Sequence, residues 1–457
     1  MKRFAGARVK LLGYTRGSDE FSYLGPEDIT AYAAHGDFSK EASYKLILKD
    51  KKRGDLGKKN KTIIKESYGR GHGSVGDIAH FTFSVEGLTR AATLQFTGPY
   101  FLEHEQQSLR RARIGDFYIP KDIRESNLYN KLDNTLDDIT KFYDEMLKDG
   151  IPKEDARFCV PLLTITNITT TGNVRELQHL HVMNKQGEVP SYVKNVVNNM
   201  IKKARKVAPN LFKKYKSNYE LLAWYPSTQI FSSENKTINK LIKKYTSKAS
   251  KSEPILLAHS SIDIGKEEIE DAIRNRNEAE LANLKHVNFE FLVDGSIAMN
   301  HQLRRQRTMD LSDESIYDAA KRREIITPPK IEKSDLKDDY LYYNNLLLDL
   351  YEELIDEGVS RKEAIGVVPH SLDIYSMIRI NGFNTYHFIG KRKCTEAQWE
   401  IRNLAWNIAR RLKGVNPTIG KYAEPQCVTY GKCPERNPCP YLEAYEKRME
   451  RNLNSSH

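Results

Sequence analysis

Arginine residues in two separated parts of the chain could bind the phosphate groups of an anionic ligand. The segment EQQSLR ends in Arg110, and the segment RQR at residues 305–307 begins with Arg305. A guanidinium group fits a phosphate through two parallel N–H donors, so arginine is the expected residue wherever phosphate is bound. Glutamine and serine residues accompany both segments and could supply neutral donors.

These two parts belong to one repeated pattern. FTFSVEG at residues 81–87 corresponds to FEFLVDG at residues 289–295. The matched pairs are Gln95 with Gln302 and Ser108 with Ser315 at an offset of 207 (302 − 95, 315 − 108), and Pro161 with Pro369 and Asn173 with Asn381 at 208. Because a solenoid repeat has only ~20–50 residues, we interpret the chain as two fused copies of one domain.

The composition is typical of a globular protein. With 457 residues, 39% of them hydrophobic, the chain is expected to form ~2–4 domains with packed cores. It has no apolar run of ~18 residues, and its first residues lack the apolar stretch of a signal peptide, which argues against membrane insertion and secretion. We therefore expect a cytoplasmic protein.

The net charge of +11 favours anionic partners in general, such as nucleotides, polyglutamylated cofactors or nucleic acid. Much of the excess lies in lysine-rich stretches at 49–65, 202–216 and 240–251. No aromatic stacking platform or nucleic-acid-binding fold signature accompanies them, so we interpret them as solvated helix faces and loops. A nucleic-acid partner is therefore not expected.

Alternation of apolar and polar residues predicts a strand in each copy, HFTFSVEG at 80–87 and NFEFLVDG at 288–295. The proline-free runs LTRAATLQF and SIAMNHQLRRQR follow and predict helices. Long amphipathic helices are predicted at 126–150 and 337–358. Each copy should thus be an α+β domain with a mixed or antiparallel sheet and long helices.

The predicted boundaries are a first copy at 1–225, a connecting region at 226–275, a second copy at 276–425 and a tail at 426–457. The turn-rich tail region carries Cys427, Cys433 and Cys439 with five residues between neighbours. This is not a standard zinc-ligand spacing, so we expect reduced, partly buried thiols and no metal. Zinc with a fourth ligand from elsewhere is the alternative.

The order of these motifs resembles the flavin-dependent thymidylate synthases over nearly the whole chain. That family carries an Arg-His-Arg triplet followed by a spaced serine-and-arginine loop. The matching segments are HGSVGD at 72–77, EQQSLR at 105–110, EDAR at 154–157, TGNVREL at 171–177, RQR at 305–307 and, after Arg392, AQWEI at 397–401. Together with Gln95, copy one has five pieces in the right order, and copy two has the same frame, which makes a chance match unconvincing.

The resemblance implies an enzyme that converts dUMP, or a related pyrimidine nucleotide, to dTMP. It implies FAD as cofactor, with NADPH and methylene-tetrahydrofolate as co-substrates. Members of the family are homotetramers whose sites are built from several subunits. Two fused copies would replace two subunits, so we expect a homodimer that forms a pseudo-tetramer.

Neither copy keeps every charged residue of the family pattern. Copy one has Gly98-Pro99-Tyr100 at the triplet, whereas copy two keeps arginines there but has Gln306 in the middle. Conversely, copy one keeps Arg110, Arg157, Arg175 where copy two has Tyr317, Ile365, Phe383, and Asn184 stands in copy one where copy two has Arg392. The losses are complementary, which predicts composite sites between unlike copies and one flavin per chain.

The resemblance also implies individual roles. The residues implied to bind the nucleotide are Gln302, Arg305, Gln106, Ser108, Leu109, Arg110 and Arg157. Those implied to bind the flavin are His72, Ser74, Arg305, Gln306, Arg307, Gln106, Asn173, Arg175 and His179. Arg392 is the expected catalytic residue, beside the uracil ring, where a cation stabilises negative charge as it develops.

The alternative is a catalytically inactive or altered-substrate relative that binds flavin, a pyrimidine nucleotide or both. Gln306 favours it, because glutamine cannot carry the charge of a histidine. Random decay, however, would remove charge from both halves of one site. We further expect Tyr317→Ala and Tyr100→Ala, at the decayed positions, to leave function almost unchanged.

Overall fold

The structure is a computed structural model that describes residues 5–214, 224–246 and 253–454, with side chains described up to residue 447. The chain forms two compact units. Unit 1 comprises Met1–Ser233 and Ser315–Ser371, and unit 2 comprises Glu234–Glu314 and Leu372–His457. No helix in the described ranges is both long enough and apolar enough to span a bilayer.

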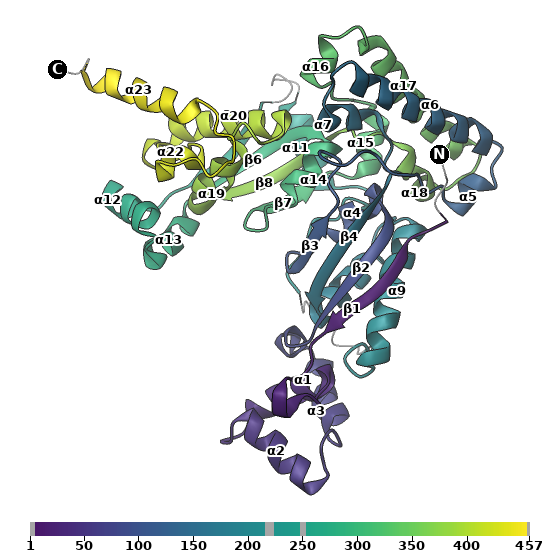
Figure 1. Cartoon of the computed structure of the whole chain (residues 1–457), viewed down its shortest axis with the longest axis vertical. Helices are drawn as coiled ribbons and strands as arrows, with labels where there is room; N and C mark the ends of the chain where they lie inside the picture. The colour runs from purple at the N-terminus through teal and green to yellow at the C-terminus, as the bar shows by residue number, and fades with distance from the viewer. Residues whose placement is uncertain (1–4, 215–223, 247–252, 455–457) are drawn as a thin grey trace. The chain divides into compact units, whose positions relative to one another are not determined.

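Each unit contains one four-stranded antiparallel sheet, and the strand order is the same in both (Figure 1). The order in unit 1 is β1 (Arg8–Tyr14), β2 (His80–Thr89), β4 (Ile165–Asn173), β3 (Leu102–Gln106). The order in unit 2 is β5 (Ile255–Ser260), β6 (Asn288–Ser296), β8 (Asp373–Asn381), β7 (Asp310–Asp313). The predicted α+β fold and its duplication are confirmed.

A short helix follows the second strand of each sheet and carries the matched glutamine. In unit 1, the Thr89 hydroxyl accepts a hydrogen bond from Ala92 N (3.1 Å) and caps α4 (Arg90–Phe96). In unit 2, Ser296 caps α14 (Ile297–Leu303) in the same way. The helix predicted to include residues 304–307 ends at Leu303, because a turn begins there in which Gln306 N bonds to Leu303 O.

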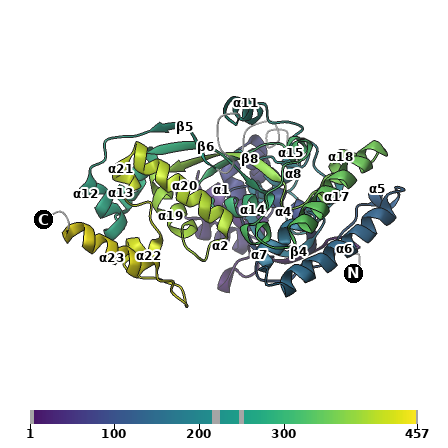
Figure 2. The same cartoon turned by 90° about the horizontal axis from the view of Figure 1, so that it is seen from above.

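The two long helices are confirmed as α6 (Tyr129–Lys148) and α17 (Lys337–Asp356). They lie side by side in unit 1, as Figures 1 and 2 show, although they come from different copies. The rings of Phe142 and Tyr343 are 4.9 Å apart, and Lys131 Nζ lies 2.6 Å from Glu353 Oε2. The compact units therefore differ from the sequence copies, whose boundaries stay predictions.

Backbone pairing also joins residues of the two copies within unit 1. Leu162 N donates to Val368 O at 3.0 Å, and His370 N donates to Val160 O at 3.0 Å. Backbone groups of residues 366–371 of copy two therefore pair with backbone groups of copy one. An exchanged segment of this kind leaves no sign in a linear sequence pattern.

Helices α8 (Val174–Met183) and α9 (Ser191–Val207) follow the last strand of copy one, and α19 (Gly382–Arg392) and α20 (Trp399–Val415) follow that of copy two. In unit 2, Phe289 and Phe291 of the sheet pack with Ile401 of α20 in the core. Strand β5 lies inside the range predicted as the connection, so part of that range is sheet.

Other helices complete the two units. In unit 1 they include α1 (Pro26–Gly36), α2 (Ser43–Arg53), α3 (Asn60–Glu66), η3 (Gly73–Asp77), α5 (Lys121–Arg124), α7 (Lys153–Ala156), η4 (Arg157–Cys159), α15 (Ile316–Arg322), α16 (Pro329–Glu332), α18 (Arg361–Ala364) and η7 (Ile365–Val367). In unit 2 they include α11 (Lys236–Tyr245), α12 (Lys266–Glu270), α13 (Glu278–Asn283), α21 (Pro417–Gly420), α22 (Gln426–Tyr430) and α23 (Tyr441–Asn454). The tail predicted as turn-rich thus contains helices.

Candidate active site

Two arginines with predicted nucleotide roles meet at one glutamate of unit 1. Arg110 Nε donates to Glu154 Oε2 at 2.7 Å, and Arg157 Nε donates to Glu154 O at 3.1 Å. The Ser108 hydroxyl accepts Arg110 N at 3.2 Å and shapes the loop that carries this arginine. Arg110 is partly exposed, whereas Arg157 is buried. The fold therefore brings together an arginine from the loop after β3 and one from the start of η4.

Gln106 and Leu109 flank this arrangement. Gln106 is the last residue of β3, and its buried Nε2 has no hydrogen-bond partner among the described residues. Leu109 is buried and anchors the loop in the core. A buried amide donor without a partner costs free energy, so Gln106 is suited to a ligand acceptor.

The predicted flavin residues of copy one converge where β4 passes into α8. Asn173 caps α8 by accepting Glu176 N at 2.8 Å, and the buried His179 lies with its Nδ1 3.4 Å from Glu176 Oε2. Arg175 forms an ion pair with Asp77 of η3 at 2.6 Å. Burial raises the pKa of Asp77, while the charge of Arg175 opposes that shift.

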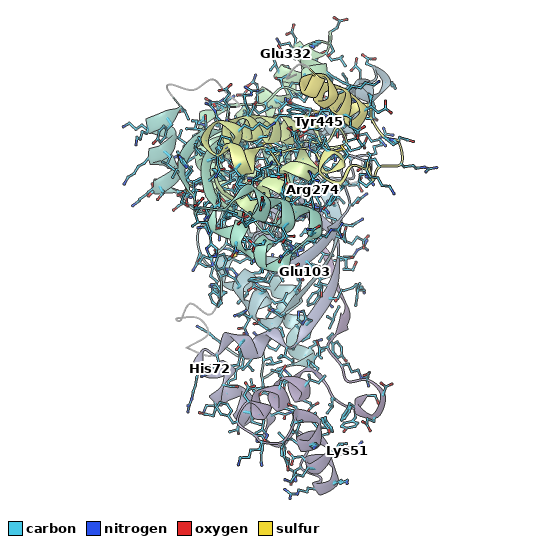
Figure 3. All side chains as sticks on the ribbon, turned by 90° about the vertical axis from the view of Figure 1, so that its left-hand side faces the viewer. Lys51, His72, Glu103, Arg274, Glu332 and Tyr445 are labelled. Carbon is cyan, nitrogen blue, oxygen red and sulfur yellow. The ribbon has the colours of Figure 1, made fainter. Side chains whose placement is uncertain are left out.

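The same ion pair positions the His72 and Ser74 segment. Both residues are exposed and lie in or next to η3, which packs on α8. Figure 3 shows His72 at the edge of unit 1, above the helical segment that carries Lys51. The fold thus brings His72 and Ser74 to the same helix as Arg175.

In unit 2, the triplet of copy two presents two exposed arginines around a buried glutamine. Arg305 and Arg307 are exposed. Gln306 Nε2 lies 2.8 Å from Thr308 Oγ1, 3.2 Å from Asn384 Oδ1 and 3.0 Å from His387 Nδ1. The glutamine at the family's histidine position is therefore held by neighbouring polar groups, and the cations on either side face solvent.

Gln302 and Arg392 belong to the same unit. Gln302 Nε2 lies 3.4 Å from Gln398 Oε1, and Gln398 caps α20 by accepting Glu400 N. Arg392 is the last residue of α19, the helix that also carries His387. Burial, with the nearby charges of Lys391 and Arg392, lowers the pKa of His387, so that imidazole stays neutral at physiological pH.

Residues 224–232 cover the decayed triplet of copy one. We call this segment the connector; it overlaps only the beginning of the predicted connecting region at 226–275. The rings of Tyr100 and Tyr225 are 5.2 Å apart, and a Cβ on Gly98 would lie 3.3 Å from Thr228 O. Trp224 stacks on His179 with ring centroids 5.3 Å apart. Aromatic packing has replaced the charged triplet at this place.

The same connector also holds the decayed loop of copy two. Ile316 N donates to Ile230 O at 3.0 Å, and the Ser315 hydroxyl donates to Ser232 O at 2.6 Å. The two decayed motifs therefore share one covering segment inside unit 1.

Tyr317 fills the position of the lost arginine with a buried ring. Its hydroxyl donates to Glu188 O, and the Arg361 guanidinium carbon lies 4.7 Å from the ring centroid. Arg361 also pairs with the Glu188 carboxylate. Our expectation for Tyr317→Ala concerns function and stays a prediction; we expect the same substitution to lower stability, because truncating a buried aromatic ring leaves a cavity.

Four cysteines lie in one neighbourhood of unit 2. Burial raises the pKa of the Cys427 thiol, and the charges of Cys433, Cys394 and Cys439 act in the same direction. Within the described ranges, no group of three or more His, Cys, Asp or Glu side chains is arranged to hold a metal ion. The sequence singled out three of these thiols but not Cys394.

Sequence reasoning assigned no ligand-positioning role to Glu154 or Asp77. Each pairs with an arginine of the predicted site, Arg110 and Arg175 respectively. Their position inside the EDAR and HGSVGD segments was the available signal. Acidic partners that orient arginines are recognised only when the distances are known.

The fold is an α+β domain present twice, and it carries the arginine, glutamine and serine residues of the family pattern. The model of the thymidylate synthase complementing protein family matches residues 21–210 and 228–418. These two matches cover most of the chain, one in each copy. The chain belongs to that family, as two tandem copies of its domain.

Several proteins are similar to parts of this chain. A flavin-dependent thymidylate synthase from Geobacter sulfurreducens is 33% identical over 175 residues, covering 37% of this chain and 75% of the relative. One from Clostridium tetani is 33% identical over 171 residues, covering 33% of this chain and 68% of the relative. A solved structure, the UMP/dUMP methylase PolB from Streptomyces cacaoi bound with 5-Br dUMP, is 15% identical to this chain with a TM-score of 0.38. The match covers 46% of this chain and 95% of PolB.

Proposed function

We propose that this protein is an FAD-dependent thymidylate synthase that methylates dUMP with methylene-tetrahydrofolate as carbon donor and NADPH as reductant. The family match in both copies and the names of the relatives support the reaction class. The expected cytoplasmic location is part of the proposal.

The observation that carries the proposal is the distribution of lost and retained motifs. The lost triplet and the lost loop lie under one connector in unit 1. The retained loop with Arg110 and the retained triplet with Arg305 stay at least partly exposed. Decay confined to one site supports selection for the other, composed of the copy-one loop and the copy-two triplet.

The residues of this composite site suit its ligands. Arg110, Arg157 and Arg305 would bind the nucleotide phosphate through charge-assisted hydrogen bonds, with Gln302, Gln106, Ser108 and Leu109 beside them. The ion pair with Glu154 holds the Arg110 guanidinium in one orientation.

The residues with predicted flavin roles would suit the diphosphate of FAD. Exposed Arg305 and Arg307 supply charge for a diphosphate, and Gln106 offers an unpartnered buried donor. With Gln306, His72, Ser74, Asn173, Arg175 and His179 they form a donor set that fits a dinucleotide. When bound, FAD supplies hydride chemistry.

Arg392 has the catalytic role in this proposal. A guanidinium beside the uracil ring would stabilise negative charge on the ring as C5 is alkylated. It would do so without a nucleophilic cysteine: Cys159, the one cysteine of copy one, is buried, and burial raises its pKa so that it remains a thiol.

Two chains would form a pseudo-tetramer with one flavin per chain. Each fused chain supplies one retained loop and one retained triplet, so half as many sites as domains result. Light scattering together with flavin absorbance measures both quantities. Two flavins per chain, or a flavin-loaded monomer at micromolar concentration, would contradict this arrangement.

The decisive experiment is dTMP formation by the purified protein supplied with FAD, dUMP, methylene-tetrahydrofolate and NADPH. Product formation that depends on all four supports the proposal. The second candidate is an inactive or altered-substrate relative, favoured by the hydrogen-bonded Gln306. Bound flavin or nucleotide without dTMP formation would support that candidate.

A further inference from the structure

The segment after the family match contacts the end of the helix that carries Arg392. The match ends at residue 418, whereas Glu424 lies beyond it and is buried. Lys393, the residue directly after Arg392, donates to Glu424 Oε2 at 2.6 Å and to Ala423 O at 3.0 Å. All these residues belong to unit 2.

Glu424 is held by further partners, so its position is well defined. Lys413 Nζ donates to its Oε1 at 2.5 Å, and the Tyr441 hydroxyl donates to its Oε2 at 3.3 Å. Burial alone would raise the pKa of this carboxyl, but the hydrogen bonds from Lys393 and Lys413 prevail and lower it. The carboxylate is therefore charged at neutral pH.

The backbone fits closely at the same place. A Cβ on Gly390 would lie 2.9 Å from Gln426 Cγ, so α19 approaches α22 at a distance that only glycine allows without a shift. The ammonium of Lys393 also lies 4.0 Å from the centroid of the Trp406 ring on α20. The last turn of α19 is thus fixed on several sides.

Copy one provides an internal comparison. Lys185 corresponds to Lys393 at the offset of 208 residues, and it is exposed, whereas Lys393 is buried. The residue before Lys185 is Asn184, which lacks charge, whereas the residue before Lys393 is Arg392. Copy two, which retains the arginine, is therefore also the copy in which the next lysine is buried.

We propose that Glu424 is a positioning residue for Arg392, acting through Lys393 to hold the end of α19 in one orientation. This inference rests on the proposed role of Arg392 at the substrate. The segment that follows the family domain would then take part in catalysis without touching the substrate.

The test compares Glu424→Gln with Lys413→Gln. Glu424→Gln removes the negative charge that holds Lys393. Lys413→Gln removes the other lysine that contacts the Glu424 carboxylate and leaves the contact between Lys393 and Glu424 in place. We expect Glu424→Gln to lower kcat ~10–100-fold, because small displacements of a catalytic group are costly. FAD affinity should change by less than about threefold, and Lys413→Gln should stay near the wild-type kcat.

A double-mutant cycle separates positioning from general destabilisation. In an Arg392→Lys background, Glu424→Gln should lower kcat less than about twofold further, because both changes act on one interaction. An equal loss of kcat in both backgrounds, or an unchanged kcat in the single variant, would overturn the inference.

Hydrogen exchange distinguishes this inference from the proposed function. Glu424→Gln should speed exchange of the amides at residues 389–393, whether or not the protein makes dTMP. Unchanged exchange overturns the role of Glu424. Two other outcomes leave the role of Glu424 standing and contradict the proposed function. In one, Glu424→Gln speeds exchange but the protein forms no dTMP; in the other, Glu424→Gln speeds exchange but Arg392→Lys keeps full turnover.

Discussion

The two copies of one loop have opposite environments. In copy one, the Arg110 side chain is partly exposed and pairs with Glu154. In copy two, Tyr317 occupies the corresponding position, and its ring is 1% exposed. The position that carries tyrosine is part of the core, whereas the position that carries arginine stays partly accessible.

The same contrast holds for the triplets. Arg305 and Arg307 face solvent on either side of a hydrogen-bonded Gln306. Gly98 and Tyr100 of copy one lie against the connector. The difference teaches that each copy has kept a different part of the charged family pattern and uses the other positions for packing.

Tyr317→Ala should give the largest effect, and it should be on stability. Loss of a buried aromatic ring costs ~3–5 kcal/mol, and the hydroxyl contact with Glu188 O is lost as well. Denaturant unfolding measures this effect. Tyr317→Phe is the matched control and should cost ~1 kcal/mol of stability. A Tyr317→Ala variant as stable as wild type would show that the loop carrying Tyr317 is not part of the core.

Arg392→Ala should reduce turnover most among the variants at exposed or partly exposed positions. Removing one group that stabilises developing charge costs ~10²–10³-fold in kcat. Asn184→Ala, at the corresponding residue of copy one, should leave kcat unchanged. Steady-state kinetics of dTMP formation measures kcat for both variants. A larger loss of kcat in Asn184→Ala than in Arg392→Ala would mean that the catalytic arginine is assigned to the wrong copy.

Arg110→Ala and Arg305→Ala should each weaken dUMP binding although they lie in different copies. Loss of one charge-assisted phosphate contact costs ~1.5–3 kcal/mol, or ~10–150-fold in Kd. Titration of dUMP followed by flavin absorbance measures the affinity. If only one of the two variants binds more weakly, the site is not composite.

Tyr100→Ala should have the smallest effect on dUMP affinity. Tyr100 stands at the decayed triplet, and its ring contacts that of Tyr225. We expect a change within about twofold in Kd, because no phosphate contact is removed. A loss as large as that of Arg305→Ala would mean that the covered site still binds nucleotide.

Much of the fold was predictable because its signals are local. The alternation in HFTFSVEG and NFEFLVDG gave β2 and β6, and apolar residues at helical spacing gave α6 and α17. Strand β5 was placed in the connecting region, since ILLAHS lies beside a lysine- and serine-rich stretch without a turn signal of its own.

The candidate site was only partly predictable. Arg110 and Arg175 could be named from their motifs, but Glu154 and Asp77 could not be recognised as their partners. Nothing in the sequence places Glu424 beside Lys393, because the two are 31 residues apart and no periodicity links them. Contacts of this range depend on how helices pack.

The sequence by itself determined the duplication, the family and the complementary loss of charged residues, because these are properties of residue identity and spacing. Only the tertiary structure decided that residues 315–371 of copy two join copy one in unit 1, and that the connector covers both lost motifs. The physical reason is that burial and hydrogen bonding are satisfied by whichever segments lie close in space, irrespective of their order in the chain.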